Sequence, residues 1–455
     1  MSFVDLLQRM LDNPNIPWKT VITAFTLGQF GFETYLNYRQ YRTLGNATLP
    51  KQLENEIDAE TLRKSDEYSR SKMKFSMFSS AFSLLENLAV IKYNLFPRVW
   101  HLGVALARRL PIKFLATSTI GQSLLFFTVL SNLSAILQLP SSYYQHFVLE
   151  EKYGFNKLTV GLWISDKIKG SLLSVALGMP LMYAFLKIFD AFQGNFLAYI
   201  CGFVLVVQIL AMTLIPVFIM PLFNKFTPLE DGDLKESIEA LARRVQFPLD
   251  KIFVVDGSKR SSHSNAYFTG LPFTSKRIVL YDTLVRDSSV DEITAVLAHE
   301  IGHWQKNHIL RMLAFSEVHI AFMFSLFSAA YQNRSLYAAF GFFLGPGASP
   351  SSSIVITPQL PVLIGFMLFN DLLQPLDCVM NFGINLLSRL HEYQADAYAK
   401  NLGYQKDLCR ALINLQVKNL STMNVDSMYS SYHYSHPTLP ERLEALDHVS
   451  ERKSE

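Results

Sequence analysis

The residues most able to do chemistry lie in the stretch AVLAHEIGHWQKNH, at positions 295–308. If this stretch is helical, His299 and His303 are one turn apart on the same face, so both imidazoles can bind one metal ion. Glu300 is offset by about 100° around the helix, which places its carboxylate beside the metal rather than on it. This order of residues is typical of zinc hydrolases, in which zinc lowers the pKa of a water to about 7 and the glutamate takes its proton. Gly302 removes a side chain between the histidines, which lets another segment approach.

A catalytic zinc site needs a third protein ligand. The long metzincin motif is excluded, because Ile309 stands where its third histidine would be. The stretch RLHEYQADAYAK, at 389–400, offers Glu392 and Asp396, which are one turn apart and share a helix face. Glu392 can be the third ligand, while Asp396 can orient a ligating histidine or share in proton handling.

Three other polar residues near these motifs are weaker candidates. His308 is off the ligand face of the expected helix, so we interpret it as a surface or interfacial histidine. Glu317 lies in the next apolar stretch, but a thermolysin-like spacing would place a ligating glutamate nearer Met323. Arg442 could bind a carboxylate, but an ion pair on a helix surface is the favoured interpretation.

The composition indicates a membrane protein with sizeable polar segments. Charged residues make up 17% of the 455 residues, whereas soluble proteins usually carry about 25%. The net charge of +3 is too small to suggest nucleic acid as a partner. The three cysteines are scattered and form no metal-binding pair.

Seven stretches are apolar and reach the length of about 20 residues that a bilayer requires. They lie at 17–37, 75–106, 114–138, 171–190, 196–223, 310–331 and 359–388. The second is overlong and contains polar residues, which indicates a tilted helix or one that projects beyond the bilayer. Polar residues within the seven stretches are costly against lipid, so their number suggests a hydrated interior.

The distribution of basic residues predicts the orientation. Lysine and arginine concentrate in segments 39–74 and 150–170, whereas the loop 332–358 holds only Arg334. By the positive-inside rule the first two segments face the cytosol and the loop faces the lumen or exterior. The basic link 108–113 opposes this assignment and is outweighed by the other segments.

Two polar blocks carry the metal candidates, both on the predicted cytosolic side. The first contains predicted helices at 229–245 and 290–305, and predicted strands at 251–255 and 277–281. The second begins as a helix that continues out of the seventh span. The predicted division of the chain is a five-span membrane region at 1–223, a segment with the two-histidine helix at 224–309, two further spans with a lumenal loop at 310–388, and a C-terminal cytosolic segment at 389–455.

Five motifs spread along the chain together resemble one enzyme family. They are FNKFTPLEDG at 223–232, SNAYFTG at 264–270, HEIGHW at 299–304, HEYQADAYA at 391–399 and SHPTLPERL at 435–443. This combination resembles the type I CAAX prenyl endopeptidases, and the likeness covers nearly the whole chain. That family comprises membrane zinc metalloproteases that mature prenylated proteins such as fungal a-factor pheromone and animal prelamin A.

The resemblance implies a role for each matching metal-site residue. It implies one zinc ion per chain, held by His299, His303 and Glu392. Glu300 resembles the general base of the family, and Asp396 resembles its proton-donating carboxylate.

Asn265 and His436 resemble groups that contact substrate or stabilise the tetrahedral intermediate. A histidine or an asparagine beside such a site can donate a hydrogen bond to a developing oxyanion. The segment NAYFTG, at 265–270, could also pair with an extended peptide by strand addition.

The implied fold is an α-helical polytopic membrane protein, in which seven transmembrane helices surround a hydrated chamber and a small α+β zinc metalloprotease domain lies on the cytosolic side. The implied reaction cleaves prenylated, CAAX-type C-termini and releases the last three residues, with a second upstream cut in a pheromone precursor. The implied partners are prenylated proteins or peptides and the lipid bilayer. The implied setting is a monomer in the endoplasmic reticulum membrane, and also the inner nuclear membrane.

Three alternatives remain open from the residues alone. A site-2-type intramembrane protease would use an aspartate from a later span, such as Asp371 or Asp377. A general membrane-protein quality-control protease would share the catalytic plan. A transporter or channel blocker with a decayed site is disfavoured, because every expected catalytic residue is present.

Overall fold

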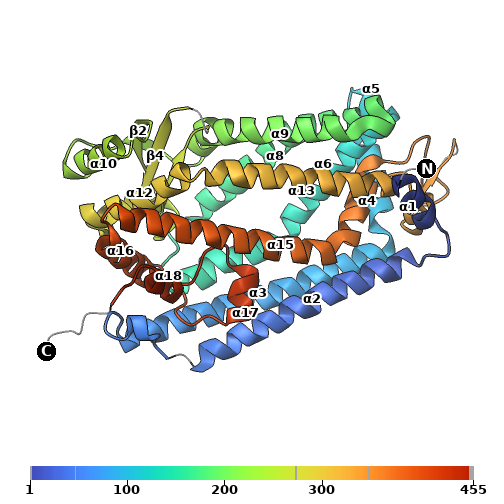
Figure 1. Cartoon of the computed structure of the whole chain (residues 1–455). Helices are drawn as coiled ribbons and strands as arrows, with labels where there is room; N and C mark the ends of the chain where they lie inside the picture. Colours follow the sequence, from blue (N-terminus) through green and yellow to red (C-terminus); the bar gives the residue numbers. More distant parts are fainter. Residues whose placement is uncertain (1–2, 47, 272–273, 347–348, 450–455) are drawn as a thin grey trace.

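The computed structural model describes residues 3–46, 48–271, 274–346 and 349–449. Long helices run along the length of the molecule, and a small sheet with shorter helices lies at one end (Figure 1). The N-terminal helix lies at the opposite end from this sheet, whereas the C-terminal helices lie near it (Figure 1). The architecture therefore matches the predicted class of a polytopic helical protein with a small α+β region at one end.

The first half of the chain is almost entirely helical. Its α-helices are α1 (Phe3–Leu11), α2 (Trp18–Thr43), α3 (Ala59–Tyr93), α4 (Leu95–Ala107), α5 (Lys113–Thr117), α6 (Thr119–Leu137), α7 (Leu139–Tyr144), α8 (Val160–Phe192) and α9 (Phe196–Leu214). Short helical turns connect or extend them, namely η1 (Leu44–Asn46), η2 (Lys51–Leu53), η3 (Gln145–Glu150), η4 (Gln193–Asn195), η5 (Ile215–Ile219) and η6 (Met220–Leu222). Each of the first five predicted spans falls on one or more of these helices.

The second predicted span consists of two helices rather than one. Asn94 adopts the left-handed backbone conformation, with φ 49° and ψ 55°, between α3 and α4, a conformation that asparagine tolerates better than most residues. α3 begins at Ala59, well before the predicted start, and has 35 residues. A helix of that length extends about 52 Å, which exceeds the hydrocarbon thickness of about 30 Å. This agrees with a helix that projects beyond the bilayer.

Four helical stretches of the described chain are long and apolar enough to cross a membrane. They are Thr119–Leu137, Val160–Leu222, His308–Ala330 and Val362–Asn401. The stretch Val160–Leu222 contains both α8 and α9, which pack against each other. α2 and α3 are more polar than these four and do not belong to this group. The polytopic character is thus clear, while the count of seven spans stays a prediction.

The second half of the chain mixes strands and helices. Its strands are β1 (Phe226–Pro228), β2 (Leu249–Val255), β3 (Ala266–Thr269), β4 (Lys276–Tyr281), β5 (Phe342–Leu344) and β6 (Val355–Thr357). Its helices are α10 (Asp233–Arg244), η7 (Gly257–Lys259), α11 (Asp282–Asp287), α12 (Val290–Gln305), α13 (His308–Ala330), α14 (Arg334–Ala339), α15 (Val362–Asn401), α16 (Gln405–Lys418), α17 (Ser427–His433) and α18 (Leu439–Ala445). The two predicted strands are confirmed as β2 and β4, and the two predicted helices as α10 and α12.

The larger sheet has the strand order β1-β2-β4-β3, so β3 lies at one edge. β2 pairs with β4 in parallel, whereas β1 and β3 pair with their neighbours in antiparallel. Apolar side chains of this sheet form one core with α10, α12 and α16. The α12 helix is therefore held on several sides by packed apolar residues, which gives its histidines a rigid support.

Candidate metal centre

The α12 helix begins at a capping box. The Ser289 side chain accepts a hydrogen bond from the Glu292 backbone, and the Ser289 backbone donates to Glu292 Oε2 over 2.9 Å. The other Glu292 oxygen accepts a hydrogen bond from Asn414 of α16 over 2.6 Å. Because the capping box satisfies backbone groups at the helix start, the position from which α12 runs toward its histidines is well determined.

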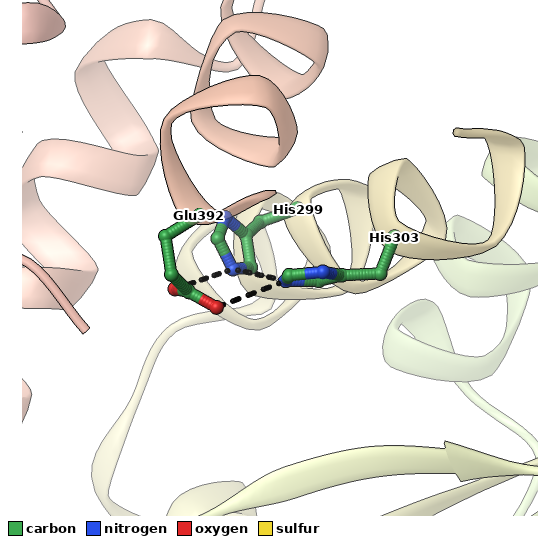
Figure 2. A group of neighbouring side chains, drawn as sticks. All are labelled: His299, His303 and Glu392. Carbon is green, nitrogen blue, oxygen red and sulfur yellow. Dashed lines mark hydrogen bonds and ion pairs between the residues drawn. The ribbon is translucent and has the colours of Figure 1, made fainter. Parts of the chain in front are cut away.

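Gly302 lets α12 and α15 approach closely. A Cβ atom at Gly302 would lie 3.0 Å from the Ala395 Cα and 3.2 Å from the Ala395 oxygen. A larger residue would press the two helices apart, because such separations are tighter than most Cβ contacts in folded proteins. The expectation that Gly302 makes room for another segment is therefore confirmed, and that segment is the part of α15 that carries Glu392 (Figure 2).

Three donor groups converge between α12 and α15 (Figure 2). His299 Nε2 lies 3.2 Å from His303 Nε2 and 3.5 Å from Glu392 Oε2. His303 Nε2 lies 3.2 Å from Glu392 Oε1. Tetrahedral zinc with bonds of about 2.05 Å holds its donors about 3.3 Å apart. The spacing of the three groups therefore fits a zinc-sized ion.

The chemistry of these donors also fits a metal ion. The Glu392 side chain is only 5% exposed, and its Oε2 lacks a hydrogen bond of regular geometry although His436 Nδ1 lies 2.8 Å away. A buried carboxylate oxygen left in this way is costly unless a cation or a donor satisfies it. Two imidazoles and one carboxylate are a ligand set of catalytic zinc sites.

Asp396 fixes the orientation of the His299 ring through a hydrogen bond. Asp396 Oδ1 accepts a hydrogen bond from His299 Nδ1 over 2.8 Å, which leaves Nε2 free to face the other two donors. Burial and Arg442 both lower the pKa of His299, but the hydrogen bonds to Asp396 and Glu392 outweigh them and raise it to about 9. Orientation of a ligating histidine by a carboxylate is a common feature of zinc sites.

Arg442 lies behind the same carboxylate and does not form the surface ion pair that we expected. Its Nε donates to Asp396 Oδ2 over 2.8 Å, and its Nη2 donates to Asp396 Oδ1 over 2.6 Å. The Arg442 side chain is 12% exposed, and its Nη1 lies 3.8 Å from Glu392 Oε2. The surface interpretation was wrong because α18 packs against α15, which a local helical pattern does not reveal.

Glu300 lies close enough to His299, His303 and Glu392 to interact with them electrostatically. The residue is partly buried, and its carboxylate makes no hydrogen bond or ion pair within the described part of the chain. Burial raises the pKa of Glu300, while the nearby His299 and His303 lower it and the net shift is upward. A carboxylate with free oxygens beside a metal site can accept a proton.

His436 connects the three donors to a large cavity of about 1110 Å³. The cavity is lined by α3, the α7–η3 region and the segment 416–439, with polar groups such as Glu86 and Lys72 in its wall. His436 lines this cavity and also lies against Glu392. Glu86 of the second predicted span lies in this wall, while a hydrated interior closed by all the spans stays a prediction.

Asn265 stands directly before the edge strand β3. Its side chain is exposed, and its Oδ1 accepts a hydrogen bond from the Ala266 backbone over 2.8 Å. β3 packs against α12, so this edge lies beside the helix that carries the histidines. Within the described part of the chain, the Asn265 side chain makes no hydrogen bond to the three donors.

Two further residues were considered from the sequence. His308 lies in a different environment from the one expected, and Glu317 lies away from the site. His308 is only 3% exposed rather than at the surface, and its Nδ1 lies 2.9 Å from His303 Nδ1. Glu317 lies further along α13 and accepts a hydrogen bond from Gln208 of α9 over 2.8 Å. Glu317 is therefore engaged within the helical bundle and does not join the three donors.

Two family models match the chain. One, described as the CAAX prenyl protease N-terminal region with five membrane helices, matches residues 40–225. The other, peptidase family M48, matches residues 228–450 and includes the metal centre. The chain belongs to peptidase family M48, and within it to the CAAX prenyl protease 1 group. It is thus a membrane-embedded, multi-pass metalloendopeptidase, and its active form holds a metal ion.

Relatives of this M48 peptidase cover nearly its full length. The chain is 64% identical to "CAAX prenyl protease 1" of Saccharomyces cerevisiae over 98% of its own length and 99% of the relative. It is 36% identical to "CAAX prenyl protease 1 homolog" of Homo sapiens over 93% of its length and 94% of the relative. The crystal structure of S. mikatae Ste24p is 62% identical, covers 96% of this chain and 100% of that one, and superposes with a TM-score of 0.90.

Proposed function

We propose that this M48 peptidase is a zinc-dependent endopeptidase that cleaves prenylated, CAAX-type C-termini and releases the last three residues. The observation that carries the proposal is the convergence of His299, His303 and Glu392 beside a cavity that is lined by α3, the α7–η3 region and the segment 416–439. The names of the relatives support the same substrate class. A second, upstream cut in a pheromone precursor would use the same site.

In this proposal His299, His303 and Glu392 hold one zinc ion. Zinc at such a site supplies Lewis acidity, which polarises a carbonyl and makes water more acidic. The hydrogen bond from His299 to Asp396 keeps Nε2 of that histidine available for the ion. Both Asp396 oxygens are engaged by His299 and Arg442, which favours a positioning role for Asp396 over the proton-donating role that the resemblance implied.

Glu300 is the proposed general base. Its free carboxylate accepts a proton from the attacking water and later delivers that proton to the leaving amine. The raised pKa of Glu300 suits this double role, because a more basic carboxylate takes the proton from water more readily and holds it until the amine leaves.

His436 and Asn265 are the proposed groups that hold the reacting peptide. His436 is 65% exposed in its side chain and faces the cavity, so it can donate a hydrogen bond to the oxyanion that develops on the scissile carbonyl. Asn265 precedes an edge strand that could add an extended peptide as a further strand. These two contacts would orient the scissile bond along the face of α12.

A site placed beside the membrane would account for a lipidated substrate. A farnesyl chain offers many buried carbons, each worth about 0.8 kcal/mol per CH₂ equivalent when it leaves water. A cavity with both polar and apolar lining, such as Met73, Phe75 and Lys72, can admit a lipid chain together with water. We expect a monomer in the endoplasmic reticulum membrane, and also in the inner nuclear membrane, with the metal centre toward the cytosol.

The deciding experiment compares farnesylated and unmodified peptides of one sequence with the purified protein in detergent, where bilayer partitioning is reduced. We expect a higher kcat/KM for the farnesylated peptide and release of a tripeptide. Equal kcat/KM values would remove prenyl recognition and favour a general membrane-protein quality-control protease. The bound metal, measured by mass spectrometry, should be one zinc ion per chain.

A site-2-type intramembrane protease is not supported. Asp377 lies on α15, as Glu392 does, but 15 positions earlier along the helix, which corresponds to about 22 Å. Asp371 lies further away still. Neither aspartate can therefore reach the histidines that Glu392 reaches in the same helix.

A further inference from the structure

A further histidine, His308, lies behind the metal centre. His308 Nδ1 lies 2.9 Å from His303 Nδ1, and His308 Nε2 lies 2.9 Å from Gln394 Oε1. His308 is only 3% exposed, so water does not readily replace either partner. The three side chains form a chain of hydrogen bonds that leads away from the donor group.

The direction of each proton in this chain follows from the acceptors. An amide oxygen only accepts hydrogen bonds, so His308 Nε2 must carry a proton toward Gln394 Oε1. In a neutral imidazole the other nitrogen is then an acceptor, so His308 Nδ1 accepts a hydrogen bond that His303 Nδ1–H donates. His303 consequently presents its unprotonated Nε2 to His299 and Glu392, which is the form that binds a metal ion.

We propose that His308 is a positioning residue for the metal centre: it fixes the tautomer and ring orientation of His303, and Gln394 in turn fixes His308. This inference rests on the proposed role of His303 as a zinc ligand. It assigns to His303 the same kind of outer support that Asp396 gives to His299, but with an uncharged partner.

The backbone is built to bring His308 back toward His303. On a continuous helix two residues five positions apart point about 140° away from each other. Here α12 ends at Gln305, and Asn307 adopts the left-handed conformation with φ 56° before α13 begins at His308. Asparagine tolerates this conformation better than most residues. The reversal allows the two imidazoles to meet, with ring centroids 5.0 Å apart.

A stacked ring fixes the plane of His308. The His391 ring lies parallel to that of His308, with an interplanar angle of 10° and centroids 4.0 Å apart. His391 precedes the ligand Glu392 and is itself buried. Rotation of His308 away from His303 would break both this stack and the bond to Gln394, so the side chain is restrained from three sides.

The burial of His308 favours an uncharged partner. Glu300, Glu392 and Asp396 already contribute carboxylates to a mostly buried region, and the positive group next to His308 is the exposed Arg311. A carboxylate in place of His308 would have to lose its hydration at this buried position, whereas a neutral imidazole held by an amide orients His303 without that cost.

The test compares zinc release from purified full-length variants, by competition with a chromophoric chelator. His308→Leu removes the acceptor, whereas His308→Asn places an amide oxygen near the former Nδ1. We expect zinc to dissociate about 10- to 100-fold faster from His308→Leu, with most of the loss recovered in His308→Asn. Gln394→Leu should fall between the two, because it removes only the residue that fixes His308.

Cobalt(II) substitution supplies a second readout that does not depend on activity. The visible absorption bands of the cobalt-loaded protein should shift in His308→Leu and return toward the wild-type position in His308→Asn. His391→Phe is the matched control, since it keeps a stacked ring but touches no hydrogen bond of the chain, and its bands should stay in place.

Several outcomes would overturn the inference. One is a folded His308→Leu protein with wild-type zinc release and cobalt bands; another is equal impairment of His308→Leu and His308→Asn, which would indicate packing alone. If His308→Leu does not fold, unchanged zinc release from Gln394→Leu overturns it instead. Wild-type protein that binds no zinc would refute the proposed function itself, so the two failures are distinguishable.

Discussion

Arg442 and Asp396 form a two-point ion pair directly behind the histidine His299. Two guanidinium nitrogens contact the two carboxylate oxygens over 2.8 and 2.6 Å, and the two side chains are 12% and 2% exposed. The planar guanidinium matches a carboxylate in a way that a lysine ammonium does not. The pair therefore neutralises Asp396 and fixes its orientation at the same time.

Removing Arg442 should destabilise the protein and loosen the metal centre. Arg442→Ala leaves Asp396 as a buried charge without its partner, which costs about 3–5 kcal/mol. Arg442→Lys should recover only part of this loss. Denaturant unfolding in detergent and zinc content provide the measurements.

The control is Arg243→Ala, whose ion pair with Glu239 is exposed and should be worth at most about 1 kcal/mol. Equal losses in the Arg442 and Arg243 variants would contradict this assignment.

Substitutions of the metal ligands should lower the zinc content of the purified protein, whereas substitution of the general base should not. His299→Ala, His303→Ala and Glu392→Ala each remove a donor and should lose zinc. Glu300→Gln should keep zinc, because this side chain lies beside the donors, yet turnover should fall by about 10²- to 10⁴-fold. Mass spectrometry and peptide cleavage on the same preparations check both quantities. A purified Glu300→Gln protein without zinc would show that the role of Glu300 is misassigned.

Metal binding to the metal-free protein should release a proton. The pKa of His299 is about 9, so this imidazole is protonated at pH 7 and must lose its proton before Nε2 can bind a metal ion. Zinc affinity should therefore rise with pH up to about 9 and level off above it. Calorimetry in buffers with different ionisation enthalpies measures the released protons.

Asp396→Asn provides the matched comparison for this proton release. It removes a carboxylate that raises the pKa of His299, so fewer protons should be released at pH 7. The same number of protons in both proteins would mean that Asp396 does not control the protonation of His299.

A side chain at Gly302 should separate α12 from α15. The Cβ of Gly302→Ala would lie 3.0 Å from the Ala395 Cα, and overpacking of this kind costs about 1–3 kcal/mol. Zinc affinity should fall as well, because the two helices carry different ligands. Gly383→Ala, on the same α15 but with no atom within 4 Å of the added Cβ, should not destabilise the protein. Wild-type zinc affinity in Gly302→Ala would show that the helix separation does not set the ligand geometry.

The predicted orientation can be tested by cysteine labelling. In a protein without its own three cysteines, single cysteines at the exposed positions Lys51, Asp291 and Ser351 report segments 39–74, 224–309 and 332–358. We expect the first two to react from the same side of the membrane and the third from the opposite side, because basic segments stay cytosolic. Labelling of Asp291 and Ser351 from one side would overturn the orientation.

The sequence by itself determined the parts of the site that depend on local geometry. His299 and His303 share a face because four residues make about one helical turn, and the same rule relates Glu392 to Asp396. The helix 290–305 and the strands of the parallel pair β2–β4 were likewise predictable, since hydrophobic periodicity is a short-range property. The predicted second span was less accurate, because the break at Asn94 depends on a single backbone conformation.

Only the tertiary structure decided what surrounds the ligands. Asp396 meets His299 across 97 positions of sequence, and Arg442 reaches Asp396 across 46, so no local spacing could rank these partners. In a helix that continued from His299 past position 308, His308 would point away from the metal. The chain instead breaks at the left-handed residue Asn307, which turns His308 back toward His303. The physical reason is that a helix repeats exact angles only within itself, whereas the angle between two helices is set by the turn that joins them and by the side chains packed between them.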